Sequence, residues 1–268
     1  MKAISLHSIV PVRAEAREGA EQNTQMLFGE LCAVLEEKPR WYRVQLESDG
    51  QEGWVDAKMI CPMKPEEYAS HRDALKNAAT VIMPMAYAVS ENNGQTVPLT
   101  AGTKLTNYQL QMTNGASSAR FEVLGVGFRI DPSMVITKPL EMTQASLLQA
   151  VRFFLNVPYL WGGKNALGMD CSGFTQVIMS LFGKHLPRNA SQQAEQGRKI
   201  SELGKAQAGD LVFFDHEDGR ISHVGILLDS ERVIHCSGRV KVEKIDGKGI
   251  FNAETGDYSH HLVSIRRV

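Results

Sequence analysis

The stretch Gly168-Met169-Asp170-Cys171-Ser172-Gly173-Phe174, with the residues that follow it up to Gly183, decides the fold of the second half of this chain. After the cysteine, apolar residues recur at helical spacing, at Phe174, Val177, Ile178 and Leu181. Asp170 is a good N-cap, and Gly183 suits the C-terminal end of a helix. The sequence therefore predicts a helix that begins directly after Asp170, with Cys171 in its first turn.

The periodicity differs on the two sides of this helix. Residues 143–155 predict another helix, whose apolar face would consist of Ala145, Leu148, Val151, Phe154 and Leu155. After Pro187 the pattern becomes that of β-strands, at residues 211–214, 224–228, 232–236 and 262–265. Residues 142–268 are therefore expected to form one α+β domain.

The front half of the chain predicts two small β-barrels. Short strands at residues 27–31, 33–35, 41–46 and 53–55 indicate a first barrel over residues 1–63. Residues 64–79 have helix-forming content and are expected to connect it to a second barrel over residues 80–138. In that second barrel, turn signals such as Asn114-Gly115 separate the strands.

Composition and charge exclude several classes of protein. With 43% hydrophobic residues and a net charge of -1, from 29 basic and 30 acidic side chains, no global field attracts nucleic acid or an anionic membrane. No stretch approaches the ~20 apolar residues of a membrane helix, and Met1 to Pro11 lacks the apolar core of a secretory signal. We therefore expect a cytoplasmic protein that binds neither nucleic acid nor membrane.

The cysteines point to free thiols. Four of them are scattered, without the C-x-x-C spacing of a zinc ribbon: Cys32, Cys61, Cys171 and Cys236. Cys171 is the candidate nucleophile, because unpaired backbone N–H groups and the positive end of the helix dipole stabilise a thiolate at this position. The neighbouring Asp170 carboxylate works slightly against a lowered thiol pKa. An arbitrary cysteine is more often a small buried apolar residue.

A cysteine nucleophile needs a base, and His223 and His235 are the candidates. If residues 229–231 form a three-residue hairpin loop, Gly225 lies opposite His235 and His223 is diagonal to it on the same face. Diagonal residues lie about 7 to 8 Å apart, within reach of two imidazole side chains. A loop one residue shorter or longer would place the two histidines on opposite faces.

Other arrangements of these residues are weaker. A zinc site can be drawn from Cys171, His223, His235 and Cys236, but Cys236 alternates to the strand face opposite His235. The remaining histidines in the second half lie in a polar loop or flank turns or the terminus, and we expect no catalytic part for them: His185, His216, His260 and His261.

Several ordered motifs in the last ~125 residues resemble the NlpC-type family of papain-like cysteine peptidases. They are residues 158–163 (PYLWGG), 168–174 (GMDCSGF), 186–188 (LPR), 208–214 (AGDLVFF) and 223–226 (HVGI). The resemblance implies a papain-like domain without metal or cofactor, in which Cys171 attacks, His223 transfers the proton and His235 orients His223. It also implies an oxyanion site made by the Cys171 backbone N–H and the Tyr159 hydroxyl.

The front half, with residues 10–13 (VPVR) and 27–30 (LFGE), resembles the two bacterial SH3-type domains of γ-D-glutamyl-L-diamino acid endopeptidases. This likeness implies an α+β protein in which two small SH3-like β-barrels precede the peptidase domain. It further implies an enzyme that cleaves murein tri- or tetrapeptides with a free N-terminal L-alanine between D-glutamate and the diamino acid, in cell-wall peptide recycling. We expect a monomer.

The same resemblance implies which residues contact the substrate. Glu52 and Tyr87 match the acid and the tyrosine that bind the peptide amine, and further contacts are implied for Trp161, Asp170, Ser172 and Asn189. Asn189 stands where the family often has aspartate, which weakens the free-amine preference by about 1 to 2 kcal/mol.

Two other functions remain open on the sequence. One is an exported hydrolase of intact peptidoglycan, in which the barrels would bind the cell wall. The other is a non-catalytic murein-peptide-binding protein that retains the fold, against which stand the intact Cys171, His223 and His235.

Overall fold

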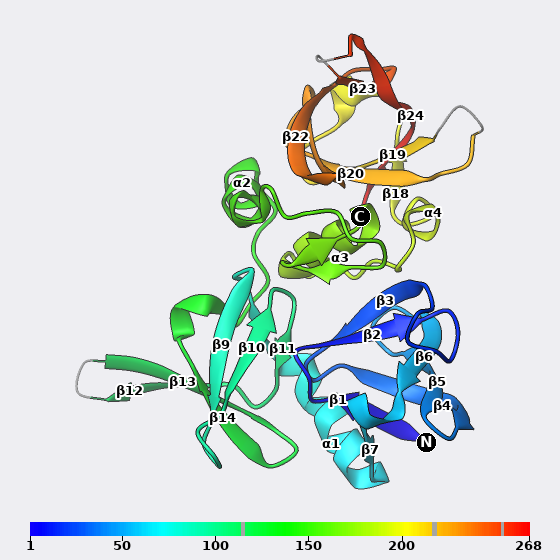
Figure 1. Ribbon diagram of the computed structural model, residues 1–268. Helices are drawn as coiled ribbons and strands as arrows, with labels where there is room; N and C mark the ends of the chain where they lie inside the picture. Colours follow the sequence, from blue (N-terminus) through cyan, green and yellow to red (C-terminus); the bar gives the residue numbers. More distant parts are fainter. Residues whose placement is uncertain (114–115, 216–218, 253–254) are drawn as a thin grey trace. The chain divides into compact units, whose positions relative to one another are not determined.

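The computed structural model describes residues 1–113, 116–215, 219–252 and 255–268. The Asn114-Gly115 turn and His216 lie outside the described residues. The chain divides into two compact units, residues 1–139 and residues 140–268, and each unit is described by itself (Figure 1). Within the described residues, no helix is long and apolar enough to span a lipid bilayer.

The first 63 residues form one antiparallel sheet with the strand order β3-β2-β6-β5-β4-β1-β7. Its strands are β1 Lys2–Ser5, β2 Ile9–Arg13, β3 Gln22–Leu27, β4 Leu31–Lys38, β5 Trp41–Leu46, β6 Glu52–Asp56 and β7 Ile60–Met63. A 3₁₀ turn, Ala57–Met59, leads from β6 to β7. The helix expected after this sheet is present as α1, Pro65–Ala74, followed by a 3₁₀ turn at Leu75–Asn77.

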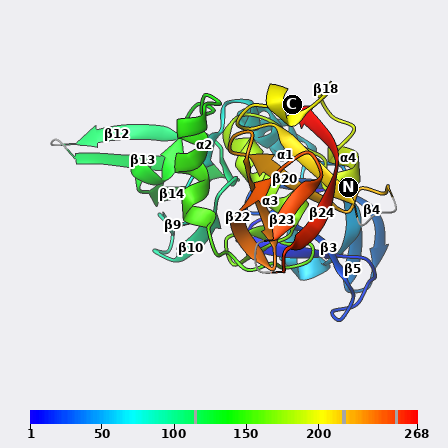
Figure 2. The same cartoon turned by 90° about the horizontal axis from the view of Figure 1, so that it is seen from above.

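Residues 79–136 add two further sheets, with the orders β10-β9-β14-β13-β12 and β11-β8-β15. Their strands are β8 Ala79–Val81, β9 Met85–Ser90, β10 Thr96–Thr100, β11 Lys104–Leu105, β12 Gln109–Thr113, β13 Ala116–Val123, β14 Val126–Ile130 and β15 Val135–Ile136. The paired strands β12 and β13 extend past the other strands of their sheet (Figure 2). This region is rich in strands, as the sequence predicts.

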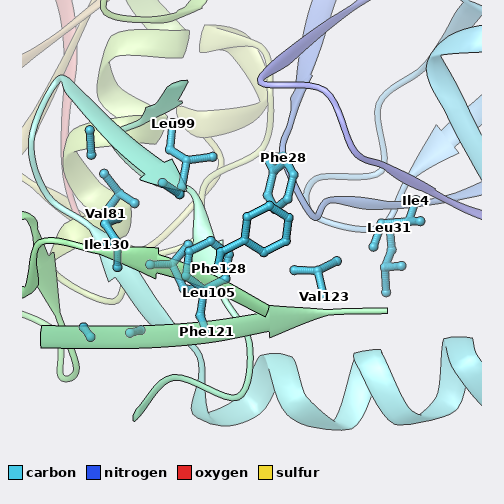
Figure 3. Close-up of a cluster of buried hydrophobic side chains, with 14 of the residues drawn as sticks. Ile4, Phe28, Leu31, Val81, Leu99, Leu105, Phe121, Val123, Phe128 and Ile130 are labelled. Atoms are coloured by element: carbon cyan, nitrogen blue, oxygen red, sulfur yellow. The ribbon is translucent and has the colours of Figure 1, made fainter. Parts of the chain in front are cut away.

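A hydrophobic cluster joins the sheets of the first unit and is shown in Figure 3, while the first sheet also encloses a cluster of its own. Phe28 packs edge-on against Phe121 and Phe128, with ring centroids 6.4 and 5.6 Å away. Ile4 and Leu31 join Phe28 from the first sheet. Because each aromatic pair adds about 0.5 to 1.5 kcal/mol beyond its buried area, this cluster ties the two sheet systems into one compact unit, a link that the sequence did not indicate.

A turn replaces the strand that the sequence predicts at residues 27–31. Gly29 has a φ of +78°, which favours glycine. Its N–H donates to the carbonyl of Ser5 (2.8 Å), and its own carbonyl accepts from Nε2 of the buried His71 (3.1 Å). The chain therefore reverses between β3 and β4, and Phe28 is directed into the shared core (Figure 3).

The second unit consists of a β-barrel and short helices. Its sheet has the order β18-β24-β19-β20-β21-β22-β23, and β23 also pairs with β24, so the six strands other than β18 close on themselves (Figure 1). The strands are β18 Arg198–Ile200, β19 Leu211–Asp215, β20 His223–Leu227, β21 Arg232–Ser237, β22 Arg239–Ile245, β23 Gly249–Asn252 and β24 Asp257–Arg267. Of these, β18, β22 and β23 are strands that the sequence did not predict.

The helices of this unit are α2 Gln144–Val151, α3 Cys171–Leu181 and α4 Ala190–Gln193, with 3₁₀ turns at Arg152–Phe154 and Leu203–Lys205. Helix α3 begins after Asp170 as predicted, and its four predicted apolar positions are buried. The predicted apolar face of α2 is wrong at three positions, because Ala145, Leu148 and Leu155 are exposed. Val151 and Phe154 of the predicted face are buried, and the helix buries Leu147 and Ala150 where the prediction had their neighbours.

Candidate active site

Cys171 is the first residue of α3, and a tight loop packs against the start of that helix. The small hairpin of β16 (Lys164–Asn165) and β17 (Gly168–Met169) precedes it. The Asp170 N–H donates to the carbonyl of Gly163 (3.1 Å). A Cβ atom on Gly173 would lie 2.1 Å from that same carbonyl oxygen, so the close approach of loop and helix requires glycine there.

The Asp170 carboxylate is saturated with hydrogen bonds. It accepts five of them, from the Gly173 N–H (2.7 Å), the Gly162 N–H (2.9 Å), the Ser172 hydroxyl (3.2 Å) and both Nη1 (3.0 Å) and Nη2 of Arg188. A carboxylate has about four lone-pair directions, so these donors occupy all of them. Arg188 is 2% exposed and also donates to the Ser172 hydroxyl (2.8 Å). The sequence motif contained Arg188, but it did not reveal this buried ion pair.

The Cys171 thiol is buried and held in its neutral form. Burial, and secondly the Asp170 charge, raise the pKa of the Cys171 thiol to about 11, although hydrogen bonds from the backbone of Val224 and Ser172 oppose this. Burial therefore opposes the thiolate stabilisation that is expected from the helix N-terminus. The thiol needs a neighbouring base before it can attack, and Val224 is next to His223 in the chain.

The two predicted histidines meet across neighbouring strands. The Leu228 N–H donates to the carbonyl of Arg232 (2.9 Å), and Gly225 pairs with His235, which is the predicted register. Nε2 of His223 lies 2.8 Å from Nδ1 of His235, and both side chains are buried. A Cβ on Gly225 would lie 3.1 Å from Cβ of His235, so glycine leaves the room that the two rings need.

Glu243, on the neighbouring strand β22, contacts His235 of this histidine pair. Its Oε2 lies 2.7 Å from Nε2 of His235 and 2.9 Å from Nζ of Lys241. The hydrogen bond with His235 lowers the pKa of the Glu243 carboxyl to about 2. Burial lowers the pKa of His235, which the Glu243 contact opposes. The sequence did not indicate Glu243, because its pattern does not predict β22.

A third histidine packs on the candidate base. The ring of His260 lies 4.3 Å from the ring of His223, centroid to centroid, and 5.6 Å from that of His235. The ring of Phe214 packs against both His223 and His260, with its centroid 5.9 Å from each of theirs. The sequence placed His260 beside a turn, whereas β24 begins at Asp257 and carries His260 opposite Ile250.

Tyr159 lies beside the nucleophile, and its hydroxyl stays protonated. Burial, and then the charges of Cys171 and Asp170, raise the pKa of this half-buried phenol. The Tyr159 N–H donates to the carbonyl of Gly238 (2.9 Å), which fixes its backbone against the turn after β21. A protonated hydroxyl is a hydrogen-bond donor, which suits the predicted oxyanion role.

The predicted substrate contacts differ in their surroundings. Trp161 is 60% exposed, whereas Ser172 is buried under Arg188. Asn189 caps α4, and its N–H and side-chain amide donate to Oε1 of Gln192 (3.2 and 3.1 Å). The saturated Asp170 has no lone pair left for a substrate amine.

Glu52 and Tyr87 belong to the first unit, whereas Cys171 and the histidines belong to the second. Glu52, on β6, accepts hydrogen bonds from Arg43 Nη2 (2.7 Å) and Gln45 Nε2 (3.2 Å). Tyr87, on β9, is 62% exposed. Their role as ligands of the peptide amine stays a prediction.

The alternative zinc site lacks one of its four donors. The Cys236 thiol donates to the carbonyl of Met169 (3.1 Å), and burial raises its pKa to about 12. It lies on the strand face opposite His235, as the alternation predicts. In the described part of the chain, no group of three or more histidine, cysteine or acidic side chains is arranged to hold a metal ion.

Two family models match this chain. Residues 156–259 match the NlpC/P60 family, and residues 12–60 match the bacterial dipeptidyl-peptidase Sh3 domain. The chain is 31% identical over 221 residues to a γ-D-glutamyl-L-lysine dipeptidyl-peptidase of Bacillus subtilis, covering 79% of this chain and 71% of that protein. A Bacillus cereus protein of the same name is 25% identical over 228 residues, covering 79% of this chain and 66% of that protein.

A solved structure shows the same fold. A crystal structure of an NlpC/P60 family protein from Bacillus cereus matches with a TM-score of 0.81 at 21% identity, over 100% of this chain and 99% of the other. The likeness extends over both units, each of which therefore has a counterpart of the same fold in that protein.

Proposed function

The chain belongs to the NlpC/P60 family of cysteine peptidases, and from this premise we propose that it hydrolyses peptidoglycan-derived peptides between D-glutamate and the diamino acid. The observation that carries the proposal is the hydrogen-bonded pair of His223 and His235 (2.8 Å), together with a backbone hydrogen bond from Val224, the residue after His223, to the buried Cys171 thiol at a helix N-terminus. The names of the two Bacillus relatives supply the γ-D-glutamyl bond.

The first step transfers a proton and forms a thioester. Nε2 of His223 is engaged with His235, so Nδ1 is the ring atom that takes the proton of the Cys171 thiol. The thiolate attacks the γ-carbonyl carbon of D-glutamate, forming the S–C bond and placing negative charge on the carbonyl oxygen. The Cys171 N–H and the Tyr159 hydroxyl donate to that oxygen. When the C–N bond breaks, Nδ1 of His223 returns the proton to the amine of the diamino acid.

Water completes the reaction. His223 takes a proton from a water molecule, whose oxygen attacks the thioester carbonyl. The tetrahedral intermediate expels the Cys171 sulfur, which recovers its proton from His223. The γ-carboxyl of D-glutamate is released on the alanyl-glutamate dipeptide.

We further propose that the enzyme prefers peptides with a free N-terminal L-alanine. Asp170 is saturated and the amide of Asn189 is engaged with Gln192, so neither adds a charge for an ammonium group. This leaves Glu52 and Tyr87 as the proposed amine ligands. A free amine at alanine is a property of peptides already cut from the glycan, which fits recycling by a monomeric cytoplasmic enzyme.

The test is mass spectrometry of L-Ala-γ-D-Glu-diaminopimelate and its lysine counterpart, each with a free and an acetylated alanine. We expect the wild type to cleave the free-amine peptides, and Cys171→Ala to abolish cleavage. Equal cleavage of acetylated peptides would favour a hydrolase of intact peptidoglycan. Binding without cleavage would favour a non-catalytic binding protein.

A further inference from the structure

Glu243 and His223 contact His235 from opposite sides, through two successive diagonals across the barrel. Gly225 of β20 pairs with His235, and Lys241 of β22 pairs with His235 on the other side. Glu243 is thus diagonal to His235 on β22, as His223 is on β20. The contacts are 2.8 Å from Nε2 of His223 to Nδ1 of His235, and 2.7 Å from Nε2 of His235 to Oε2 of Glu243.

The carboxylate determines which nitrogen of His235 carries a proton. Because the pKa of Glu243 is lowered to about 2 by its hydrogen bond to His235, the group is ionised at neutral pH and only accepts. Nε2 of His235 must therefore be the N–H donor. Lys241, which donates to the same Oε2 (2.9 Å), keeps the carboxylate in place.

The proton on His235 in turn determines the proton on His223. Burial lowers the pKa of His235, so its ring is neutral and carries one proton. With that proton on Nε2, Nδ1 is an acceptor, and Nε2 of His223 must be the donor of the 2.8 Å hydrogen bond. A neutral His223 with its proton on Nε2 has its basic lone pair on Nδ1.

We propose that Glu243 is a positioning residue of this active site, which holds the proton of His235 on Nε2 and, through it, the proton of His223 on Nε2. His223 is thereby kept in the one tautomer whose Nδ1 can accept the Cys171 proton. The inference rests on the proposed function because it takes Cys171 as the nucleophile and His223 as its base. It does not depend on which peptide is cleaved.

Negative charge on Glu243 also stabilises the imidazolium that His223 becomes. The groups that face His235 are Glu243 and Lys241 from β22, His223 from β20 and His260 from β24. Glu243 is the one anion in this set, so its loss should lower the pKa at which protonated His223 loses its proton.

The test compares Glu243→Gln and Glu243→Leu in the full chain. Glutamine keeps an acceptor oxygen but also offers N–H donors, so it no longer excludes a proton on Nδ1 of His235. Leucine removes the partner altogether. We expect kcat to fall about 10-fold for Gln and about 100-fold for Leu, with KM nearly unchanged. Glu231→Gln, which removes an exposed charge from the loop between β20 and β21, is the matched control and should leave kcat unchanged.

A second readout needs no peptide substrate. The rate of Cys171 alkylation by iodoacetamide is measured against pH by peptide mass, because the exposed Cys61 will be alkylated as well. The acid limb of this profile, along which protonated His223 loses its proton and becomes able to accept the Cys171 proton, should move to lower pH in both Glu243 variants and stay in place in Glu231→Gln. ¹⁵N spectra of histidine-labelled wild type, assigned with His235→Gln, should show the His235 proton on Nε2.

These results separate the proposal from simpler roles. A proton on Nδ1 of His235 in the wild type, or a Gln variant with wild-type kcat and alkylation profile, would overturn it. If the Leu variant does not fold, the Gln variant alone decides. A shifted alkylation profile in a protein that cleaves none of the murein peptides would support the role of Glu243 and reject the proposed substrate.

Discussion

Two carboxylates lie next to proposed catalytic residues in the second unit, Asp170 beside Cys171 and Glu243 beside His235. Asp170 is buried and accepts five hydrogen bonds, three of them from backbone N–H groups and a hydroxyl and two from Arg188. Glu243 is partly exposed and binds His235 and Lys241 through one oxygen. The number of donors and the degree of burial therefore distinguish the two carboxylates. Asp170 holds the backbone at the start of α3 in place, whereas Glu243 keeps the proton of His235 on Nε2.

Asp170→Asn should have the largest effect on the free energy of unfolding. It leaves the guanidinium of Arg188 buried without its charge partner, and breaking a buried pair in this way costs about 3 to 5 kcal/mol. The measurement is denaturant unfolding of the full chain, with hydrogen exchange of the α3 amides assigning the loss to the second unit. Glu195→Gln, an exposed carboxylate of the same unit, should stay within about 0.5 kcal/mol of wild type.

An Asp170→Asn variant with wild-type stability and a raised KM for free-amine peptides would contradict this assignment. It would make Asp170 a ligand of the substrate amine, as the family resemblance implies. The Glu243 variants should show the reverse pattern, with kcat and the alkylation profile changed and stability affected much less.

Glu52 is a third carboxylate to compare with these two. Glu52→Gln should have the smallest effect of the three substitutions, a moderate rise in KM. Glu52 has two side-chain donors and a side chain that is 38% exposed, so it retains acceptor capacity that Asp170 lacks. Removing its charge should raise KM for free-amine peptides by a factor that corresponds to about 1 to 2 kcal/mol. Steady-state kinetics on paired free and acetylated peptides measure this, with the exposed Glu37→Gln as control. An equal rise for both peptides would reject the amine role.

The histidine pair could be predicted because its geometry is local. A three-residue loop at 229–231 fixes the register of β20 and β21, and the period of two then places His223 and His235 on one face. The N-cap at Asp170 and the helical spacing after Cys171 are equally local, and they predicted α3 correctly.

The partners of these residues could not be predicted in the same way. Lys241 and Glu243 are charged residues on the inward face of β22, and charged side chains in a short segment do not indicate a barrel strand. The glycine turn at Gly238, with φ of +69°, was the available signal. It joins β21 to β22 and pairs Ser237 with Arg239, from which the diagonal position of Glu243 follows.

Long-range packing accounts for the other differences. Arg188 is fully buried, which is rare for arginine and depends on an ion pair 18 positions away in the sequence. Phe28 leaves its predicted strand because its ring packs edge-on against Phe121 and Phe128, two stacked rings that lie far along the chain. Neither contact can be seen in the periodicity of a local segment.

The most direct test of the account is covalent labelling of the nucleophile by a substrate-shaped probe. The probe is L-Ala-γ-D-glutamate in which a diazomethyl ketone replaces the bond to the diamino acid, and the labelled residue is identified by peptide mass. We expect one label, on Cys171, that is lost in His223→Ala. Labelling at Cys61, or no label at Cys171 in a protein that still cleaves the peptide, would contradict it.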